Sequence, residues 1–220
     1  NIFTTNKNFD PKVPWVADPA DPKGEEKALK VRTALNLAVN REAIIKYILK
    51  GEGIANPSPY FFPGDPWIDS KWTYAYDPEE AKKLLAEAGY AKGFEVTMRL
   101  VAMPGRPEAP AIGQAVAMDW EKIGIKVKQV PQEYVVFRPD AANRNLAGAA
   151  VAIGLAASDE PYSGFMITEW SKGATNFGVE STVLDKLLEE ASKEIDYNKR
   201  VELNRQIGQL NYDSRWTVPI

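Results

Sequence analysis

The sequence contains no cysteine and no histidine among its 220 residues. The chain therefore forms no disulfide and offers no thiol nucleophile, no Cys or His metal ligand and no imidazole for acid–base catalysis. It also lacks any apolar run close to the roughly 20 residues needed to cross a bilayer. The absence of cysteine does not indicate a cellular compartment, because many exported bacterial proteins also lack cysteine.

Neither sign of charge dominates the composition. The chain has 27 basic and 30 acidic residues, which give a net charge of −3. A protein that coats nucleic acid or anionic lipid would carry a basic excess, so we expect no nucleic-acid partner. Hydrophobic residues make up 45% and charged residues 26%, which is ordinary for a globular protein with a sizeable core.

Apolar periodicity and capping residues predict most of the helices. Residues 25–39 and 41–49 form two helices, with Asn40 as the N-cap of the second. Asp77 caps a third helix, and Glu80 completes a capping box there. Further helices are predicted over 107–123, over 132–147, in a short segment that reaches Trp170, and over 182–195 and 197–213, which join at Asp196.

Five segments read as strands. Residues 93–102 and 125–130 alternate between apolar and polar side chains, and 147–157 is small, apolar and uninterrupted, as in a buried central strand. Residues 216–220 predict a terminal strand, and 1–24 predict a short strand followed by an irregular connector. Because strands and helices alternate, the fold class is α/β or mixed α+β.

The segment "GLAASDEPYSGFMITEW", 154–170, is a candidate binding region. Polar and aromatic side chains follow a buried strand there, and ligands of open α/β sheets bind at the carboxyl ends of strands. Asp159 and Glu160 are alternatively a solvated turn or the cap of the next helix. Tyr162 and Trp170 either stack on a ligand or pack the short helix, and packing is the commoner outcome.

The aromatic loop over residues 54–76 either borders a cleft or, more in keeping with ordinary loops, covers the core with its own side chains. Arg99, Arg106 and Arg138 would suit an anionic ligand, although solvated arginine is far commoner.

Enzyme signatures are poor. Acid pairs such as Glu79–Glu80 are adjacent in helices, so their side chains do not face each other across one bond. Ser163 has no histidine to activate it, and no loop has calcium-binding spacing. A carboxylate-dependent hydrolase such as a glycosidase stays open as an alternative, and it would need two acids roughly 5 to 10 Å apart. A domain that only mediates interactions is a third possibility.

Four motifs in a fixed order resemble one family, the family 5 extracellular solute-binding proteins, which are receptor subunits of oligopeptide and dipeptide ABC importers. The motifs are "VRTALNLAVNREAIIKYILKGEG", "YDPEEAKKLLAEAGYAKGFEVTMRL", "AVAMDWEKIGIKVKQV" and "TVLDKLLEEASKEIDYNKRVELNRQIGQL". Each alone is weak, but their order and spacing are specific. The resemblance covers the chain from about residue 28 to its end.

The resemblance implies a periplasmic-binding-protein type II lobe, with a central mixed sheet flanked by helices. Residues 1–220 would be the second of two lobes, 1–24 a connector from a first lobe that this sequence does not contain, and 216–220 the start of the return to it. A peptide or similar polar solute would be held in a cleft between the lobes, and the closed form would be presented to ABC importer permease subunits.

The resemblance also implies an extracytoplasmic location, in the periplasm or as a cell-surface lipoprotein, with no cofactor and no catalysis. In peptide-binding relatives an Asp pairs with the amino terminus of the ligand. If Glu160 is aligned with the family's acidic residue before proline, that Asp position falls near Ala157, and Asp159 is displaced from it. The turn "GATNFGV" lies where relatives approach the cleft, although it also reads as an ordinary turn. The residues expected to bind ligand are Asp159, Glu160, Tyr162, Trp170, Asn176 and Phe177.

Overall fold

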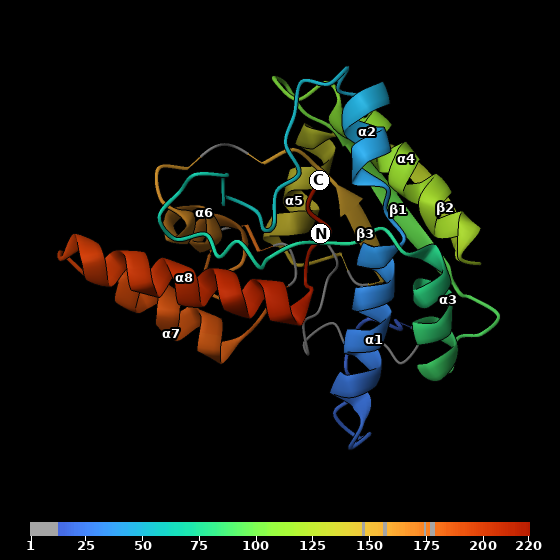
Figure 1. The fold of residues 1–220 in the computed structure, drawn as a ribbon, viewed down its shortest axis with the longest axis horizontal. Coiled ribbons are helices and arrows are strands. Elements are labelled where there is room, and N and C mark those ends of the chain that lie inside the picture. Colours follow the sequence, from blue (N-terminus) through green and yellow to red (C-terminus); the bar gives the residue numbers. More distant parts are fainter. Residues whose placement is uncertain (1–12, 147, 156–157, 174, 177–178) are drawn as a thin grey trace.

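A computed structural model describes residues 13–146, 148–155, 158–173, 175–176 and 179–220 (Figure 1). The elements are α1 (Gly24–Leu37), α2 (Arg41–Tyr47), α3 (Pro78–Glu87), β1 (Glu95–Ala102), α4 (Ala109–Lys122), β2 (Lys126–Glu133), α5 (Tyr134–Ala142), β3 (Ala149–Ala152), α6 (Pro161–Thr168), α7 (Thr182–Ala191) and α8 (Tyr197–Ser214). Among the described elements, two helices come first, helices and strands then alternate from α3 to β3, and three helices follow.

The sheet has the strand order β2-β1-β3, and both pairings are parallel. The mixed sheet that was expected is therefore parallel among the described strands. The strand predicted over 147–157 is shorter, and it lies at an edge of the sheet instead of at its centre. Its small apolar residues are still buried, because helices cover both faces, and this burial explains why it resembled a central strand.

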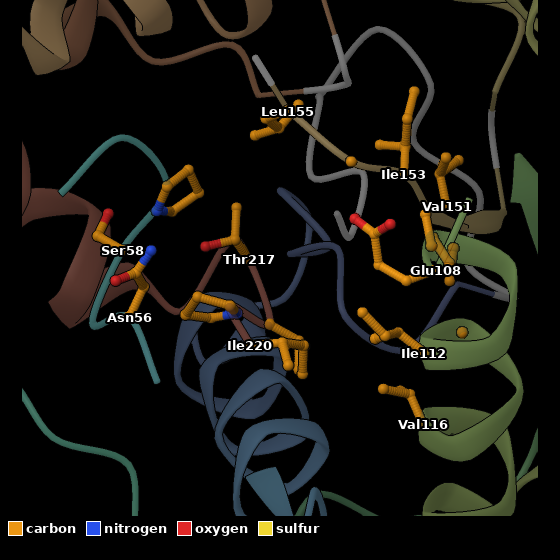
Figure 2. Close-up of a pocket in the computed structure, with 18 of the residues that line it drawn as sticks. Asn56, Ser58, Glu108, Ile112, Val116, Val151, Ile153, Leu155, Thr217 and Ile220 are labelled. Atoms are coloured by element: carbon orange, nitrogen blue, oxygen red, sulfur yellow. The ribbon is translucent and has the colours of Figure 1, made fainter. Parts of the chain in front are cut away.

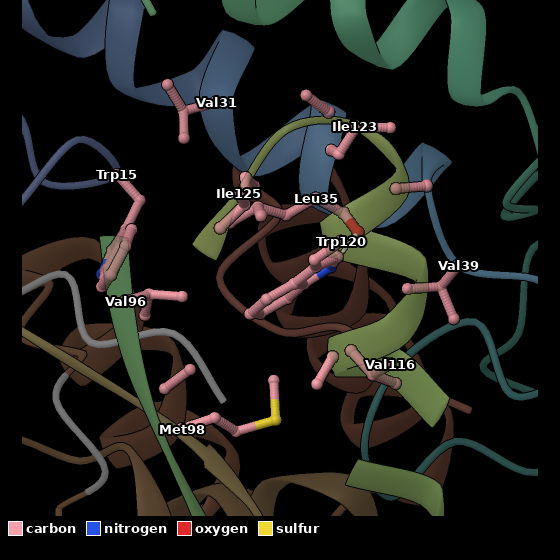
Figure 3. Close-up of a cluster of buried hydrophobic side chains, with 14 of the residues drawn as sticks. Trp15, Val31, Leu35, Val39, Val96, Met98, Val116, Trp120, Ile123 and Ile125 are labelled. Carbon is pink, nitrogen blue, oxygen red and sulfur yellow. Dashed lines mark hydrogen bonds between the residues drawn. The ribbon is translucent and has the colours of Figure 1, made fainter. Parts of the chain in front are cut away.

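Alternation along β1 assigns its two faces to different helices. Val96, Met98 and Leu100 pack in one cluster with residues of α1, α3 and α4, whereas Val101 packs with Phe137 of α5 in another. Figure 3 shows the first of these clusters around Trp120. The indole Nε1–H of Trp120 donates to the Leu35 carbonyl at 3.0 Å, which satisfies the buried donor and ties α4 to α1.

A second cluster forms where the aromatic loop lies against α6, α7 and α8, which Figure 1 shows grouped at one end of the molecule. Tyr60, Phe61, Trp67 and Trp72 are buried there, and Phe61 contacts Phe165 of α6 edge-on at a centroid separation of 6.3 Å. This confirms the interpretation that the loop covers the core with its own side chains.

The predicted caps are largely confirmed. The side chains of Asn40, Asp77 and Asp196 each accept a backbone N–H from the first turn of their helix. The capping box at Glu80 is only half formed, because the Glu80 carboxylate pairs with Lys83 instead of returning to the cap. Exposed carboxylates have such alternatives, whereas a short cap side chain does not.

The prediction of a strand at residues 216–220 is wrong, since that segment is irregular. Its carbonyl groups accept from side chains instead of from a neighbouring strand. Asn36 Nδ2 donates to Thr217 O at 3.0 Å, and Arg41 Nε donates to Pro219 O at 2.7 Å. At the other end, the strand predicted at the start of the chain falls largely on residues 1–12, outside the described residues, and 13–23 form turns.

These contacts belong to a buried polar seam, which we define as Arg32, Asn36 and Arg41. All three side chains are at most 5% exposed. Arg32 donates to Ser214 O at 2.7 Å and Trp15 O at 2.9 Å, and it also pairs with Glu25. The seam thus attaches the end of α8 and the segment after it to α1 and α2.

We expect Arg32→Met to lower the free energy of unfolding by about 3 kcal/mol, because it removes the guanidinium group that donates to the Ser214 and Trp15 carbonyls. Urea denaturation measures this change. Lys27→Met on the same helix is the control, because Lys27 pairs with Asp21 at the surface and its substitution should change the free energy of unfolding little. Equal losses in the two variants would contradict a special role for the seam.

Gly208 allows the aromatic loop to approach α8. A Cβ built at this position would lie 2.6 Å from Trp72 Cζ3 and 2.7 Å from Phe61 Cε1. Helix propensity alone favours alanine by about 1 kcal/mol, but overpacking costs about 1–3 kcal/mol. We therefore expect Gly208→Ala to be net destabilising in denaturant unfolding, while the exposed control Gln206→Ala is near neutral. A stabilised Gly208→Ala would show that the loop packs loosely.

Candidate ligand-binding groove

A groove of about 270 Å³ lies between β3, the first half of α4 and the segment 217–220. Figure 2 shows Ile112 and Val116 of α4 on one side and Thr217 and Ile220 on the other. Asn56 and Ser58 lie beyond Thr217 in the same view, and Tyr60 and Phe62 of the aromatic loop also line the groove. Four segments far apart in the sequence therefore build one site.

Consecutive residues 150–155 all line this groove. Side chains of a strand alternate between its faces, so an unbroken run indicates that the groove follows the edge of β3. Among the described strands, β3 pairs only with β1, so its other edge has no strand partner. Such an edge presents backbone N–H and C=O groups that an extended ligand can pair with.

Two hydroxyl groups in the groove wall are already engaged behind it. Ser58 and Thr217 are at most 2% exposed, and both hydroxyls donate to Asn211 Oδ1, at 3.0 and 3.3 Å. The Asn211 amide in turn donates to Glu169 Oε2 at 3.4 Å. These bonds orient the hydroxyls away from a ligand and make this part of the wall effectively apolar.

Glu169 is the buried end of that network. Its side chain is 1% exposed at the end of α6, and burial raises the pKa of its carboxyl group to about 8. The group is therefore mostly protonated at neutral pH, when it can both accept and donate hydrogen bonds. Burial likewise raises the pKa of Tyr60, whose hydroxyl donates to Thr168 Oγ1 at 3.2 Å.

Among the described residues that line the groove, Glu108 has the one charged side chain. It lies at the start of α4, and Figure 2 shows its carboxylate directed from the helix toward Thr217. In the described part of the chain its carboxylate makes no ion pair or hydrogen bond, while its backbone carbonyl accepts from the Ile112 N–H at 3.0 Å. Arg106, two residues earlier, donates to the Gly105 and Leu155 carbonyls instead.

Glu160, predicted to bind ligand, is held by α8. Arg200 contacts both carboxylate oxygens, at 3.0 and 3.1 Å from Nε, and Asn204 Nδ2 donates to Oε2 at 3.0 Å. Glu160 thus anchors the start of α6 to α8. Asp159 beside it is exposed. Neither residue lines the groove, so their role in binding stays a prediction.

The other predicted residues are also separate from the groove. Tyr162 and Trp170 pack against the second core cluster, and the Tyr162 N–H donates to Asn204 Oδ1 at 3.0 Å. Asn176 is 1% exposed and donates to Trp170 O at 3.2 Å and Val179 O at 2.8 Å, so it stabilises its own turn. Phe177 lies outside the described residues. The role of these residues in ligand binding therefore stays a prediction.

Sequence reasoning overlooked Glu108, Glu169 and Asn211. A single acid in the apolar run "GFMITEW" was a usable signal for Glu169, because an isolated acid there is either buried or functional. Glu108 carried no such signal, since it stands in a loop rich in proline beside a helix start. Its place in the groove depends on segments more than 40 residues away in either direction.

The described residues hold no group of three or more acids that could bind a metal ion. Arg99, a candidate for anions, pairs with Asp140 at 2.5 Å. Within the described ranges, no helix combines the length and the apolar character that a membrane span requires.

The chain matches a protein-family model described as bacterial extracellular solute-binding proteins, family 5 middle, over residues 4–176. A dipeptide-binding protein of Escherichia coli is 32% identical over 194 residues, which are 84% of this chain and 36% of that protein. Heme-binding protein A of Haemophilus influenzae is 31% identical over 198 residues, 87% of this chain and 36% of that protein. The chain thus spans little more than a third of these relatives.

The fold is similar to that of a solved periplasmic binding protein, DppA of Helicobacter pylori in complex with the peptide STSA. The TM-score is 0.72 at 25% identity, and the match covers 87% of this chain and 38% of that chain. The predicted fold class, an α/β lobe of the periplasmic-binding-protein type, is confirmed by this similarity and by the parallel sheet with helices on both faces.

We expect Glu169→Gln to change the pH dependence of stability. The unfolded chain releases this proton near pH 4.5, and the folded protein keeps it until about pH 8. The contribution of Glu169 to stability is therefore full at low pH and is lost as the pH rises through this window. Glutamine does not titrate, so the free energy of unfolding of the variant should rise relative to that of the wild type between pH 5 and pH 8.

Urea unfolding at several pH values measures this difference, which should exceed about 1 kcal/mol across the window. Glu202→Gln, an exposed change on α8, is the control and should give a nearly constant difference. Parallel profiles for Glu169→Gln and the wild type would mean that Glu169 ionises in the fold as it does in water.

Proposed function

The chain belongs to the bacterial extracellular solute-binding proteins of family 5, and we propose that it forms one lobe of a receptor for an ABC importer. The receptor captures a peptide or similar small polar solute in a cleft between two lobes. The chain covers 36% of the E. coli dipeptide-binding protein, which agrees with one lobe of a longer protein.

The observation that carries the proposal is the groove along the unpaired edge of β3. An extended peptide has the backbone N–H and C=O groups that such an edge pairs with, and this pairing is independent of the peptide's side chains. The apolar walls supply contact area, and few polar groups are left to discriminate between side chains. This combination suits a receptor that accepts peptides of varied sequence.

Family membership alone does not choose the ligand. Relatives of nearly equal similarity are named for a dipeptide and for heme. This chain has no histidine or cysteine to bind a heme iron, so only methionine or tyrosine could serve as an axial ligand from it. The structural relative was solved with a peptide. We therefore favour a peptide on the chemistry of the groove.

Capture proceeds by hinge closure of the two lobes, and the closed form is what the permease subunits recognise. Residues 1–24 connect to the first lobe, and 216–220 begin the return to it. The family description gives an extracellular protein, and we place the receptor in the periplasm or, as a lipoprotein, at the cell surface. Asp159, Glu160, Tyr162, Trp170, Asn176 and Phe177 remain the predicted ligand contacts of this lobe outside the groove.

The glycosidase alternative needs two carboxyl groups on either side of one bond. Among the described residues that line the groove, Glu108 is the one acid, and Glu169 is sealed behind the wall. The geometry therefore favours binding without bond cleavage.

Calorimetry on the two-lobe protein tests the proposal, with free-amino dipeptides to pentapeptides as ligands. We expect at least one length to bind, and we expect the 220-residue chain alone to bind the same peptide at least about 100-fold more weakly, because half of the contacts are missing. Equal affinity of the chain and the two-lobe protein would contradict an interlobe cleft. Binding of no peptide would contradict the ligand class.

For a peptide that binds, Asp159→Asn separates a contact from a solvated turn. If Asp159 pairs with the amino terminus, the variant should lose affinity for the free-amino peptide but not for its N-acetylated form. The exposed change Asp213→Asn on α8 is the matched control and should affect neither. Unchanged affinity in Asp159→Asn would remove Asp159 from the binding site.

A further inference from the structure

The groove combines apolar walls with a single charge. The described residues that line it include no lysine or arginine, and Glu108 carries the one acidic side chain among them. Ile112 and Val116 from α4 face Ile220 across the groove (Figure 2), and Val218 is also among its lining residues. A ligand that fills this space must therefore present apolar surface to both sides and meet a carboxylate at one place.

The Glu108 carboxylate is not used by the fold. It makes no cap hydrogen bond at the start of α4 and takes part in none of the ion pairs of the described residues. The nearest arginine along the chain, Arg106, is directed to the Gly105 and Leu155 carbonyls at 2.8 and 3.4 Å. The N-terminal end of α4 favours a negative charge at this position, which keeps the carboxylate available.

A carboxylate beside an apolar surface favours ligands that carry a positive charge. A cationic amine placed there forms a charge-assisted hydrogen bond, whereas a neutral ligand leaves the carboxylate partly desolvated without a partner. Asn56, which also lines the groove, makes no hydrogen bond within the described residues and can accept a second amine proton. The engaged hydroxyls of Ser58 and Thr217 do not compete for that role.

We propose that the groove is a binding site for small amphipathic cations, in which Glu108 pairs with an ammonium group and the walls formed by α4 and 217–220 enclose the apolar part. Glu108 is the specificity-determining residue of the site. The inference deepens the proposed function, because it names the chemistry that this lobe selects, but its test needs only the 220-residue chain.

The test uses 2-phenylethylamine as the probe. Two comparison ligands are 2-phenylethanol, which lacks the charge, and ethylamine, which lacks the ring. Ligand titrations are followed by NMR through the methyl groups of Ile112 and Val116. We expect 2-phenylethylamine to bind at least about five-fold more tightly than either comparison ligand, a factor that matches a partly exposed ion pair. The shifted methyl groups locate the binding in the groove.

Glu108→Gln keeps the shape of the side chain and removes its charge, so it should reduce the affinity for 2-phenylethylamine to that for 2-phenylethanol. Glu121→Gln, an exposed change on the same helix away from the groove, is the matched control and should leave both affinities unchanged. Each variant's methyl spectrum reports whether it is folded as the wild type.

Three results would overturn the inference: the amine does not bind at millimolar concentration, the alcohol binds as tightly as the amine, or Glu108→Gln keeps the preference for the amine. These outcomes are independent of the proposed function. Peptide binding by the two-lobe protein together with no amine binding by the chain would remove the inference alone. Amine binding by the chain together with no solute bound by the two-lobe protein would remove the receptor function alone.

Discussion

The polar seam of Arg32, Asn36 and Arg41 is the constraint on which the rest of the structure depends. Buried guanidinium and amide groups must find acceptors, and here they find the main-chain carbonyls of Ser214, Thr217 and Pro219. Burial lowers the pKa of Arg41 to about 10, which still leaves it charged at neutral pH. The segment after α8 is therefore held by one amide and one guanidinium donor from helices near the start of the chain.

The groove is a consequence of this attachment. Because side chains of α1 and α2 engage the carbonyl groups of residues 217–219, the segment lies opposite β3 without pairing with it. The edge of β3 is left open, and α4 closes the space from the side. A site able to bind an extended ligand thus arises from an unpaired strand edge next to a fixed wall. That arrangement agrees with the receptor family to which the chain belongs.

Two acids near the groove have opposite roles because their surroundings differ. Glu169 is sealed behind the groove wall, where burial raises the pKa of its carboxyl group to about 8 and Asn211 donates to it. Glu108 is partly exposed at the start of α4 and is directed into the groove, where its charge is available to a ligand. Residue type alone would not have distinguished them.

Local structure was largely predictable from the sequence. Helix starts at Asn40, Asp77 and Asp196 follow from the side chain of the cap and the turn beside it, which are contacts within a few residues. The ordered motifs also identified the family and hence the class of fold. The aromatic loop was correctly expected to cover a core, since aromatics in that number must be buried somewhere.

Tertiary structure decided the remainder. The apolar segment 216–220 has a strand-like sequence, yet its carbonyls are taken by Arg41 and Asn36, about 180 residues earlier in the chain. The partners of Glu160, Arg200 and Asn204, come from α8, about 40 residues later in the chain. The groove combines residues from four distant segments. Short-range pattern determines elements and caps, whereas partners brought together by folding determine which strand edge stays open and which acid stays charged.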